Sequence, residues 1–163
     1  MAYDYSALMT EVETLVKATW PEAILWSENV NTRNTFTSFE MLRKNIIEAS
    51  REDNPNPPYI VIELGSAVTD QDLGIRQGYK RVPGTIIYVG ENMTLDNLTA
   101  KLTALQAAFD SPTRTVGEFA VMEDGEILTV EDCPAHRALV AIGKALLSAG
   151  QVSWNPGFLV AGI

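Results

Sequence analysis

The sequence predicts a single α+β domain, and three observations support this prediction. The chain has 163 residues, a length that fits one domain with one hydrophobic core. Two short runs rich in β-branched and apolar residues, 59–64 and 85–89, predict core strands. Segments in which apolar residues recur every three or four positions lie before and after these runs and predict helices.

The first helix is predicted at 5–19, where four apolar residues share one face of a 3.6-residue period: Leu8, Val12, Leu15 and Val16. Pro21 ends it at Trp20, because the residue before a proline avoids the helical conformation. Residues 23–26 have the composition of a short strand. The stretch 29–38 is rich in Asn and Thr and predicts an exposed loop.

A second helix is predicted at 39–50, with Ser38 or Thr37 as its N-cap. The following segment, 51–58, contains three prolines and two asparagines, and we interpret it as a short connection inside one domain. The strand at 59–64 is apolar on both faces, so we expect it to be central in the sheet.

Residues 64–84 are predicted to form an extended hairpin or loop between the two core strands. The alternation of polar and apolar residues is weak there, and Pro83-Gly84 indicates a turn or bulge. Five charged residues of this segment are candidates for contact with a partner: Asp70, Asp72, Arg76, Lys80 and Arg81.

The second half of the chain predicts a helix at 95–109, with Thr94 as N-cap. A hairpin is predicted between 119–122 and 127–130, because Asp124-Gly125 is a preferred type I′ turn pair. Residues 137–149 fit a short helix or a strand with a bulge at Gly143. The segments 151–154 and 158–160 are predicted to be extended and docked, on this sheet or on a neighbouring molecule.

Composition narrows the classes of function. The net charge of −9 is incompatible with non-specific binding of nucleic acid through the bulk surface. Such a charge fits a soluble cytosolic protein, or a surface along which DNA passes without being held. No apolar run approaches the roughly 18–20 residues that span a bilayer, and the acidic N-terminal segment is unlike a signal peptide. The single cysteine, Cys133, excludes an intramolecular disulfide and a CxxC zinc site.

Few motifs indicate chemistry. Cys133 and His136 could form a nucleophile–base pair, but three-residue spacing with an intervening proline is more typical of a loop. The loop glycines match no nucleotide-binding motif. Arg76, Lys80 and Arg81 form a small basic patch, which fits either a partner contact or solvated strand edges. Three glutamates are interpreted as a solvated acidic surface: Glu11, Glu13 and Glu22.

One set of segments carries a resemblance to a known family. These segments are Pro58-Tyr59-Ile60-Val61, Arg81-Val82-Pro83-Gly84, the strand 86–89 and the helix 95–109. Their order after an N-terminal helix resembles that of the tail terminator, or tail completion, proteins of long-tailed phages and related particles. The helix and linker at 39–56 depart from the family pattern as an insertion, and the segment from Cys133 onward is longer than in that pattern.

The resemblance implies a mostly antiparallel sheet with helices packed on one face. It also implies a structural virion protein of the tail or neck, assembled in the host cytoplasm, without enzymatic activity, cofactor, metal or membrane contact. Copies of the chain would form a ring, usually hexameric. One side of the ring would cap the tail tube protein, and the other would meet the head-side connector or neck protein. DNA would pass through the lumen without specific binding.

For such a ring, the charged segment between the core strands is the expected subunit or partner interface, with Asp70, Asp72, Arg76, Lys80 and Arg81 as its residues. Three alternatives stay open. The chain could be another neck or head-completion protein, or a stand-alone adaptor. It could also be a small cytosolic enzyme or ligand-binding domain that uses Cys133 and His136.

Overall fold

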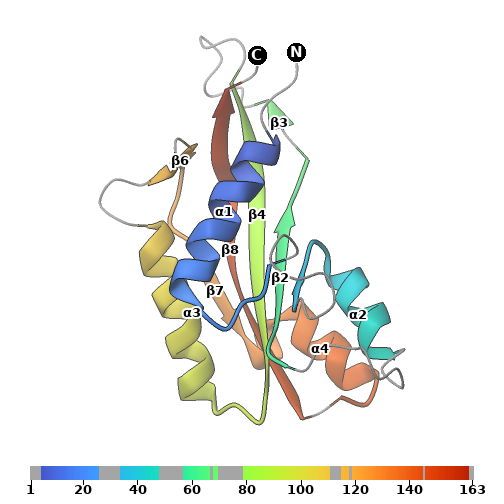
Figure 1. Cartoon of the computed structure of the whole chain (residues 1–163). Coiled ribbons are helices and arrows are strands. Elements are labelled where there is room, and N and C mark those ends of the chain that lie inside the picture. The colour runs from blue at the N-terminus through green and yellow to red at the C-terminus, as the bar shows by residue number, and fades with distance from the viewer. Residues whose placement is uncertain are drawn as a thin grey trace.

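A computed structural model describes residues 5–25, 34–47, 57–66, 68–69, 79–110, 115–117, 119–144 and 146–161. These residues form one mixed, mostly antiparallel sheet with α-helices packed against it (Figure 1), so the predicted α+β class is confirmed. The elements in chain order are α1 (Tyr5–Thr19), β1 (Thr35–Phe36), α2 (Phe39–Ile47), β2 (Tyr59–Leu64), β3 (Val68–Thr69), β4 (Tyr79–Glu91), α3 (Leu95–Phe109), β5 (Thr115–Val116), β6 (Phe119–Val121), β7 (Glu126–Thr129), the 3₁₀-helix η2 (Val130–Asp132), α4 (Pro134–Ala141) and β8 (Leu147–Ala161).

Two long strands, β4 and β8, form the middle of the sheet. They pair antiparallel from Tyr79 opposite Ala161 to Glu91 opposite Leu147. The strand order is β1-β2-β4-β8-β6-β5, with β3 also paired to β4 and β7 also paired to β8. Only the β1–β2 pairing is parallel among the described strands.

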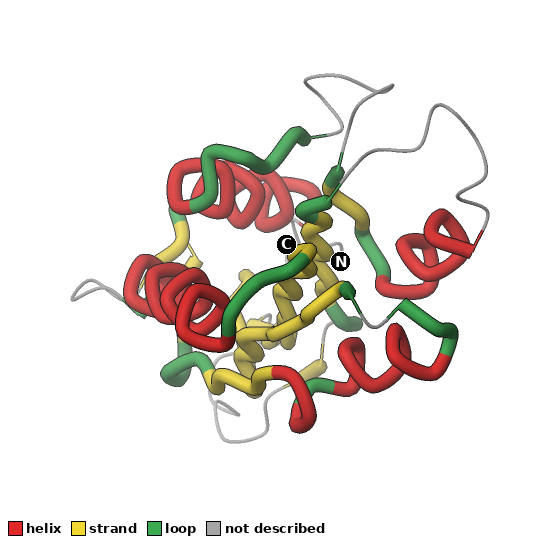
Figure 2. The backbone as a smooth tube through the Cα atoms, turned by 90° about the horizontal axis from the view of Figure 1, so that it is seen from below, coloured by secondary structure: helices red, strands yellow, loops and turns green. Residues whose placement is uncertain are grey.

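Both faces of this sheet are covered by helices (Figure 2), which corrects the expectation that helices pack on one face. Alternate residues of a strand point to opposite faces. In β2, Ile60 and Ile62 therefore join one core, while Tyr59 and Val61 join the other. The first core is filled by α1 and α3, through Leu8, Val12, Val16, Leu98, Leu102, Leu105 and Phe109. The second core is filled by α2 and α4, through Leu42, Ile46, Ala135 and Leu139.

The helices at 5–19 and 95–109 have the predicted bounds. The N-cap of α3 is the predicted one: the Thr94 hydroxyl accepts a hydrogen bond from the Asn97 amide at 3.2 Å. At the start of α2, the Ser38 hydroxyl accepts from the Met41 amide at 3.2 Å. The C-terminal ambiguity resolves into both structures, because α4 ends before Gly143 and β8 begins at Leu147.

The segment 23–38 differs from its prediction. Residues 23–25 form no strand, and β1 lies inside the stretch predicted to be an exposed loop. Asn34 explains the difference, because its carbonyl accepts the Ile60 amide at 2.8 Å and its side-chain oxygen accepts the Ile24 amide at 2.7 Å. The buried side chain of Phe36 then packs with the α2 and α4 core. Trp26, the last residue of the predicted strand, lies outside the described residues.

The predicted hairpin around Asp124-Gly125 is wrong. β6 and β7 both pair with β8 and do not pair with each other. Gly125 lacks the positive φ that a type I′ turn needs. Its amide instead donates to the Asp110 carboxylate at 2.8 Å, and a Cβ at this position would lie 2.6 Å from Val152. Glycine is therefore required here for close packing.

The long strand β8 contains both C-terminal segments that were predicted to be extended, and it docks on this sheet through Ala161. Its pairing with β4 is irregular between Val82 and Gly84, where the predicted bulge lies. Gly157 has φ +102° at this bulge, and a Cβ there would lie 2.1 Å from the Val82 carbonyl oxygen.

The structure describes only part of two predicted segments, 39–56 and 64–84. In the expected insertion 39–56, α2 packs into the second core, and residues 48–56 lie outside the described part. In the segment 64–84, β3 pairs with β4, with Val68 opposite Arg81 and Thr69 opposite Lys80.

Two glycines with positive φ give a matched test of the bulge. Gly143→Ala meets no atom within 4 Å at φ +83°, so we expect a loss of about 1 kcal/mol in unfolding free energy from backbone strain alone. Gly157→Ala adds the clash with the Val82 carbonyl, so its loss should exceed about 3 kcal/mol. Urea unfolding measures both, and equal losses would contradict this account of the bulge.

Candidate partner interface

The predicted interface residues lie mostly beyond the described part of the chain. Asp70, Asp72 and Arg76 are outside the described residues, whereas Lys80 and Arg81 lie in β4. Because they are neighbours in a strand, their side chains point to opposite faces of the sheet. Lys80 shares the face of Val82, which belongs to the α1 and α3 core, and Arg81 faces the other side. The structure therefore does not bring these two charges into one patch.

Arg81 has a position set by the β8 bulge. Its guanidinium donates a hydrogen bond to the Asn155 side-chain oxygen at 3.3 Å. Asn155 is exposed, and the β3–β4 and β4–β8 pairings hold the Arg81 backbone on both sides. This end of β4 thus presents a charge that is held in place and accessible to a partner.

Cys133 and His136 do not form a nucleophile–base arrangement. The Cys133 side chain is fully buried in the α2 and α4 core, and its thiol lies 3.7 Å from the Gln151 amide oxygen. Burial raises the pKa of this thiol, which disfavours the reactive thiolate. His136 Nδ1 accepts a hydrogen bond from the Ala149 amide at 3.3 Å. Both side chains thus serve the packing of α4 on β8.

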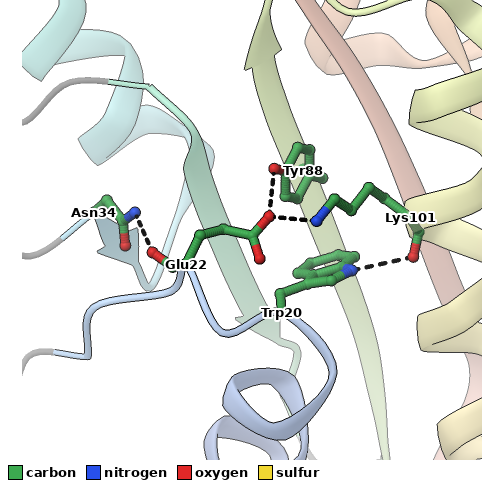
Figure 3. Close-up of polar contacts among 5 residues, drawn as sticks. All are labelled: Trp20, Glu22, Asn34, Tyr88 and Lys101. Carbon is green, nitrogen blue, oxygen red and sulfur yellow. Dashed lines mark hydrogen bonds and ion pairs between the residues drawn. The ribbon is translucent and has the colours of Figure 1, made fainter.

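A polar network joins the first helix to the sheet (Figure 3). The Glu22 carboxylate accepts hydrogen bonds from the Tyr88 hydroxyl at 2.8 Å and from the Lys101 ammonium at 2.5 Å. The Trp20 indole donates to the Lys101 carbonyl at 3.1 Å, and its ring packs edge-on against Tyr88. Asn34 donates to the Glu22 carbonyl at 3.0 Å. One carboxylate thereby links the end of α1, the strand β4 and the helix α3.

The charges in this network shift their neighbours' pKa values. Burial alone would raise the pKa of Glu22, but the hydrogen bonds from Lys101, its own backbone and Tyr88 outweigh it, so the pKa is lowered. Burial and the Glu22 carboxylate both raise the pKa of Tyr88, which stays a protonated donor. Glu22 is therefore an ionised structural group, which corrects its interpretation as part of a solvated acidic surface.

A second glutamate, Glu13, lines a groove of about 250 Å³ beside β1. The other lining side chains come from α1, β1, the start of α2 and β2: Met9, Thr35, Phe36, Thr37, Met41 and Ile62. Burial raises the pKa of the Glu13 carboxyl. Among the described residues, ion pairs join Glu22 to Lys101 and Glu40 to Arg43, and Glu13 takes part in neither of these two. Sequence reasoning missed this groove, because Glu13 alone resembles any surface glutamate.

Among the described residues, large apolar side chains are exposed on α2, at Leu95 of α3, on α4 and on the turn that follows α4. Met41 and Ile47 lie on α2, Val140 lies on α4 and Leu146 precedes β8. Leu146 is 66% exposed and Val140 is 48% exposed. Lys144 and Leu146 line a further groove of about 400 Å³, together with Tyr59 and Glu91. Exposed apolar groups rimmed by charge are typical of partner-binding surfaces.

Within the described ranges, no group of three or more His, Cys, Asp or Glu side chains could hold a metal ion. Among the described helices, none has the length and apolar character needed to cross a bilayer. Neither the protein-family models nor the curated proteins yield a match to this sequence.

The network around Glu22 gives a pH-dependent prediction. The folded pKa of Glu22 lies below its ordinary value of 4.5, so its stabilisation is present above about pH 4.5 and is lost as the pH falls through the lower folded value. Glu22→Gln should lower the unfolding free energy at pH 7 by about 1 kcal/mol, a figure discounted for partial exposure. Urea unfolding between pH 3 and 7 should show this difference shrinking towards acid.

Glu13→Gln is the matched control. Burial disfavours the ionised Glu13, so this carboxyl-to-amide change should not lower the unfolding free energy at pH 7. A Glu22→Gln loss that stays constant down to pH 3 would contradict the assigned role of the carboxylate.

Proposed function

We propose that this chain is a structural subunit of a ring that terminates the tail tube of a long-tailed phage or related particle. The ring joins the tube to the head-side connector and lets DNA pass. The observation that carries the proposal is that the segments of the family resemblance form one unit. β2 pairs in register with β4, and Leu98, Leu102 and Leu105 of α3 belong to the same core as the side chains on one face of these two strands.

The surfaces of the described residues also favour a role in assembly. The exposed apolar side chains on α2, on α4 and before β8 suit contacts with protein partners. The net charge of −9 suits a lumen along which DNA slides, because like charge prevents the phosphates from binding. The buried Cys133 and the engaged His136 give no support to the enzyme alternative.

The shape of the assembly tests the proposed ring. The purified protein, examined by negative-stain imaging and light scattering over a range of concentrations, should form rings with an axial hole. Head-to-tail contacts between identical copies close into rings when the rotation between neighbours permits. A compact two-fold dimer at all concentrations would contradict the ring.

The charged residues at and before the start of β4 test where the subunits of the ring make contact. Reversing Arg76, Lys80 and Arg81 together to glutamate should abolish assembly if this segment is a subunit contact. Because Lys80 and Arg81 point to opposite faces, the two single reversals should differ, and the more damaging one identifies the contacting face. Thr99→Glu combined with Thr103→Glu, both at exposed positions on α3, makes the same change in net charge as one single reversal and is the control for those variants. Intact assembly of the triple variant would reject this interface.

A further inference from the structure

Two surfaces of this chain complement each other in charge and in apolar character. The first is the Glu13 groove, defined above by Met9, Glu13, Phe36, Met41 and Ile62 with two threonines. The second, which we call the α4 patch, consists of Arg137, Val140, Lys144 and Leu146, all exposed. The Glu13 groove surrounds one carboxylate with apolar side chains. The α4 patch combines two apolar side chains with the cations of Arg137 and Lys144.

The groove has the size and lining of a socket for one side chain. Its volume of about 250 Å³ lies below the roughly 300–1,000 Å³ of typical small-molecule sites. Lysine and arginine pack an aliphatic stem against apolar surface and keep the charged head at a polar group. Met9 and Met41 supply adaptable walls for such a stem, and Glu13 supplies the counter-charge at the groove.

The charge of Glu13 is not compensated by its own helix. Lys17 lies four residues further along α1, but its ammonium donates to the Ala23 carbonyl at the end of that helix. The hydroxyl of Thr35 donates to the Ile24 carbonyl, and that of Thr37 points to the Met41 sulfur. A half-buried carboxylate with such neighbours gains stability when a cation enters from outside.

Within one copy, Glu13 lies on α1 and the α4 patch lies on and just after α4, and these two helices pack on opposite faces of the sheet. The separate cores to which α1 and α4 belong show that the two helices cover opposite faces. A second copy can present its α4 patch to the groove. Because the two surfaces differ, this contact is head-to-tail and can repeat from copy to copy, as a ring requires.

We propose that the Glu13 groove of one copy receives a basic side chain from the α4 patch of the next copy. This inference rests on the proposed ring, and it names the subunit contact within it. Either Arg137 or Lys144 enters the groove, while Val140 and Leu146 become covered around it.

Charge reversal tests the contact, with sedimentation velocity as the measure of self-association. Glu13→Lys should weaken association at least roughly tenfold, because two cations then face each other. Arg137→Glu or Lys144→Glu should weaken it to a similar extent. Combining Glu13→Lys with the reversal of its true partner should restore association, since the pair is then re-formed with its signs exchanged.

Two further variants keep the result interpretable. Glu123→Lys makes the same change in net charge at an exposed position in the β6–β7 connection and should leave association unchanged. Glu13→Gln removes the charge without introducing a new one, so it should fold normally and weaken association. Thermal unfolding of each variant verifies its fold.

The outcomes separate this inference from the ring proposal. If wild-type rings form and Glu13→Lys leaves them intact, the groove contact is overturned and the ring stands. If the protein associates through Glu13 but imaging shows no ring, the contact stands and the ring is overturned. A monomer at every concentration overturns the second copy as occupant. Failure of both double variants to restore association overturns the α4 patch as partner.

Discussion

The pairing of β4 with β8 is the constraint on which the rest of the fold depends. It runs almost the whole length of both strands and directs the buried apolar side chains of β4 alternately into two cores. Ile86 and Tyr88 face α1 and α3, while Ile87 and Val89 face α2 and α4. A slip of one residue would exchange the two sets, so the register is strongly specified.

The polar network around Glu22 depends on the same pairing. Tyr88 reaches Glu22 because β4 directs this residue towards α1, and Lys101 reaches it because α3 packs on the same face. The network also holds the chain just after α1, because the Asn34 side chain donates to the Glu22 carbonyl. The Asn34 carbonyl accepts from the Ile60 amide and so attaches β1 to the edge of β2. The walls of the Glu13 groove follow from this attachment, since β1 and the start of α2 supply half of them.

Local chemistry allowed much of the fold to be predicted. The periodic apolar faces and the Thr94 cap defined α1 and α3, and the apolar run 59–64 defined β2. That run is apolar on both sides, which predicted a central strand; the second helical layer that covers its other face was not predicted. β1 and the true role of Gly125 could not be predicted, because each depends on contacts far away in sequence: Asn34 with Ile60, and Gly125 with Val152. Glu13 and Glu22 were misjudged for the same reason.

The bulge in β8 has a consequence for how the length of this chain can vary. Val82 of β4 lies opposite Phe158 of β8, and Gly84 lies opposite Trp154. One residue of β4 therefore spans the same length as three residues of β8, so β8 contains two extra residues at the bulge. An even number of extra residues leaves Trp154 and Phe158 on the same face, where Trp154 stacks on Phe109 and the Phe158 ring packs against it at a tilt. A single added or deleted residue would turn the end of β8 over and expose Phe158 and Val160. Residues can therefore be inserted at this bulge only in even numbers if the fold is to be kept. The length of β8 can vary, but only in steps of two residues.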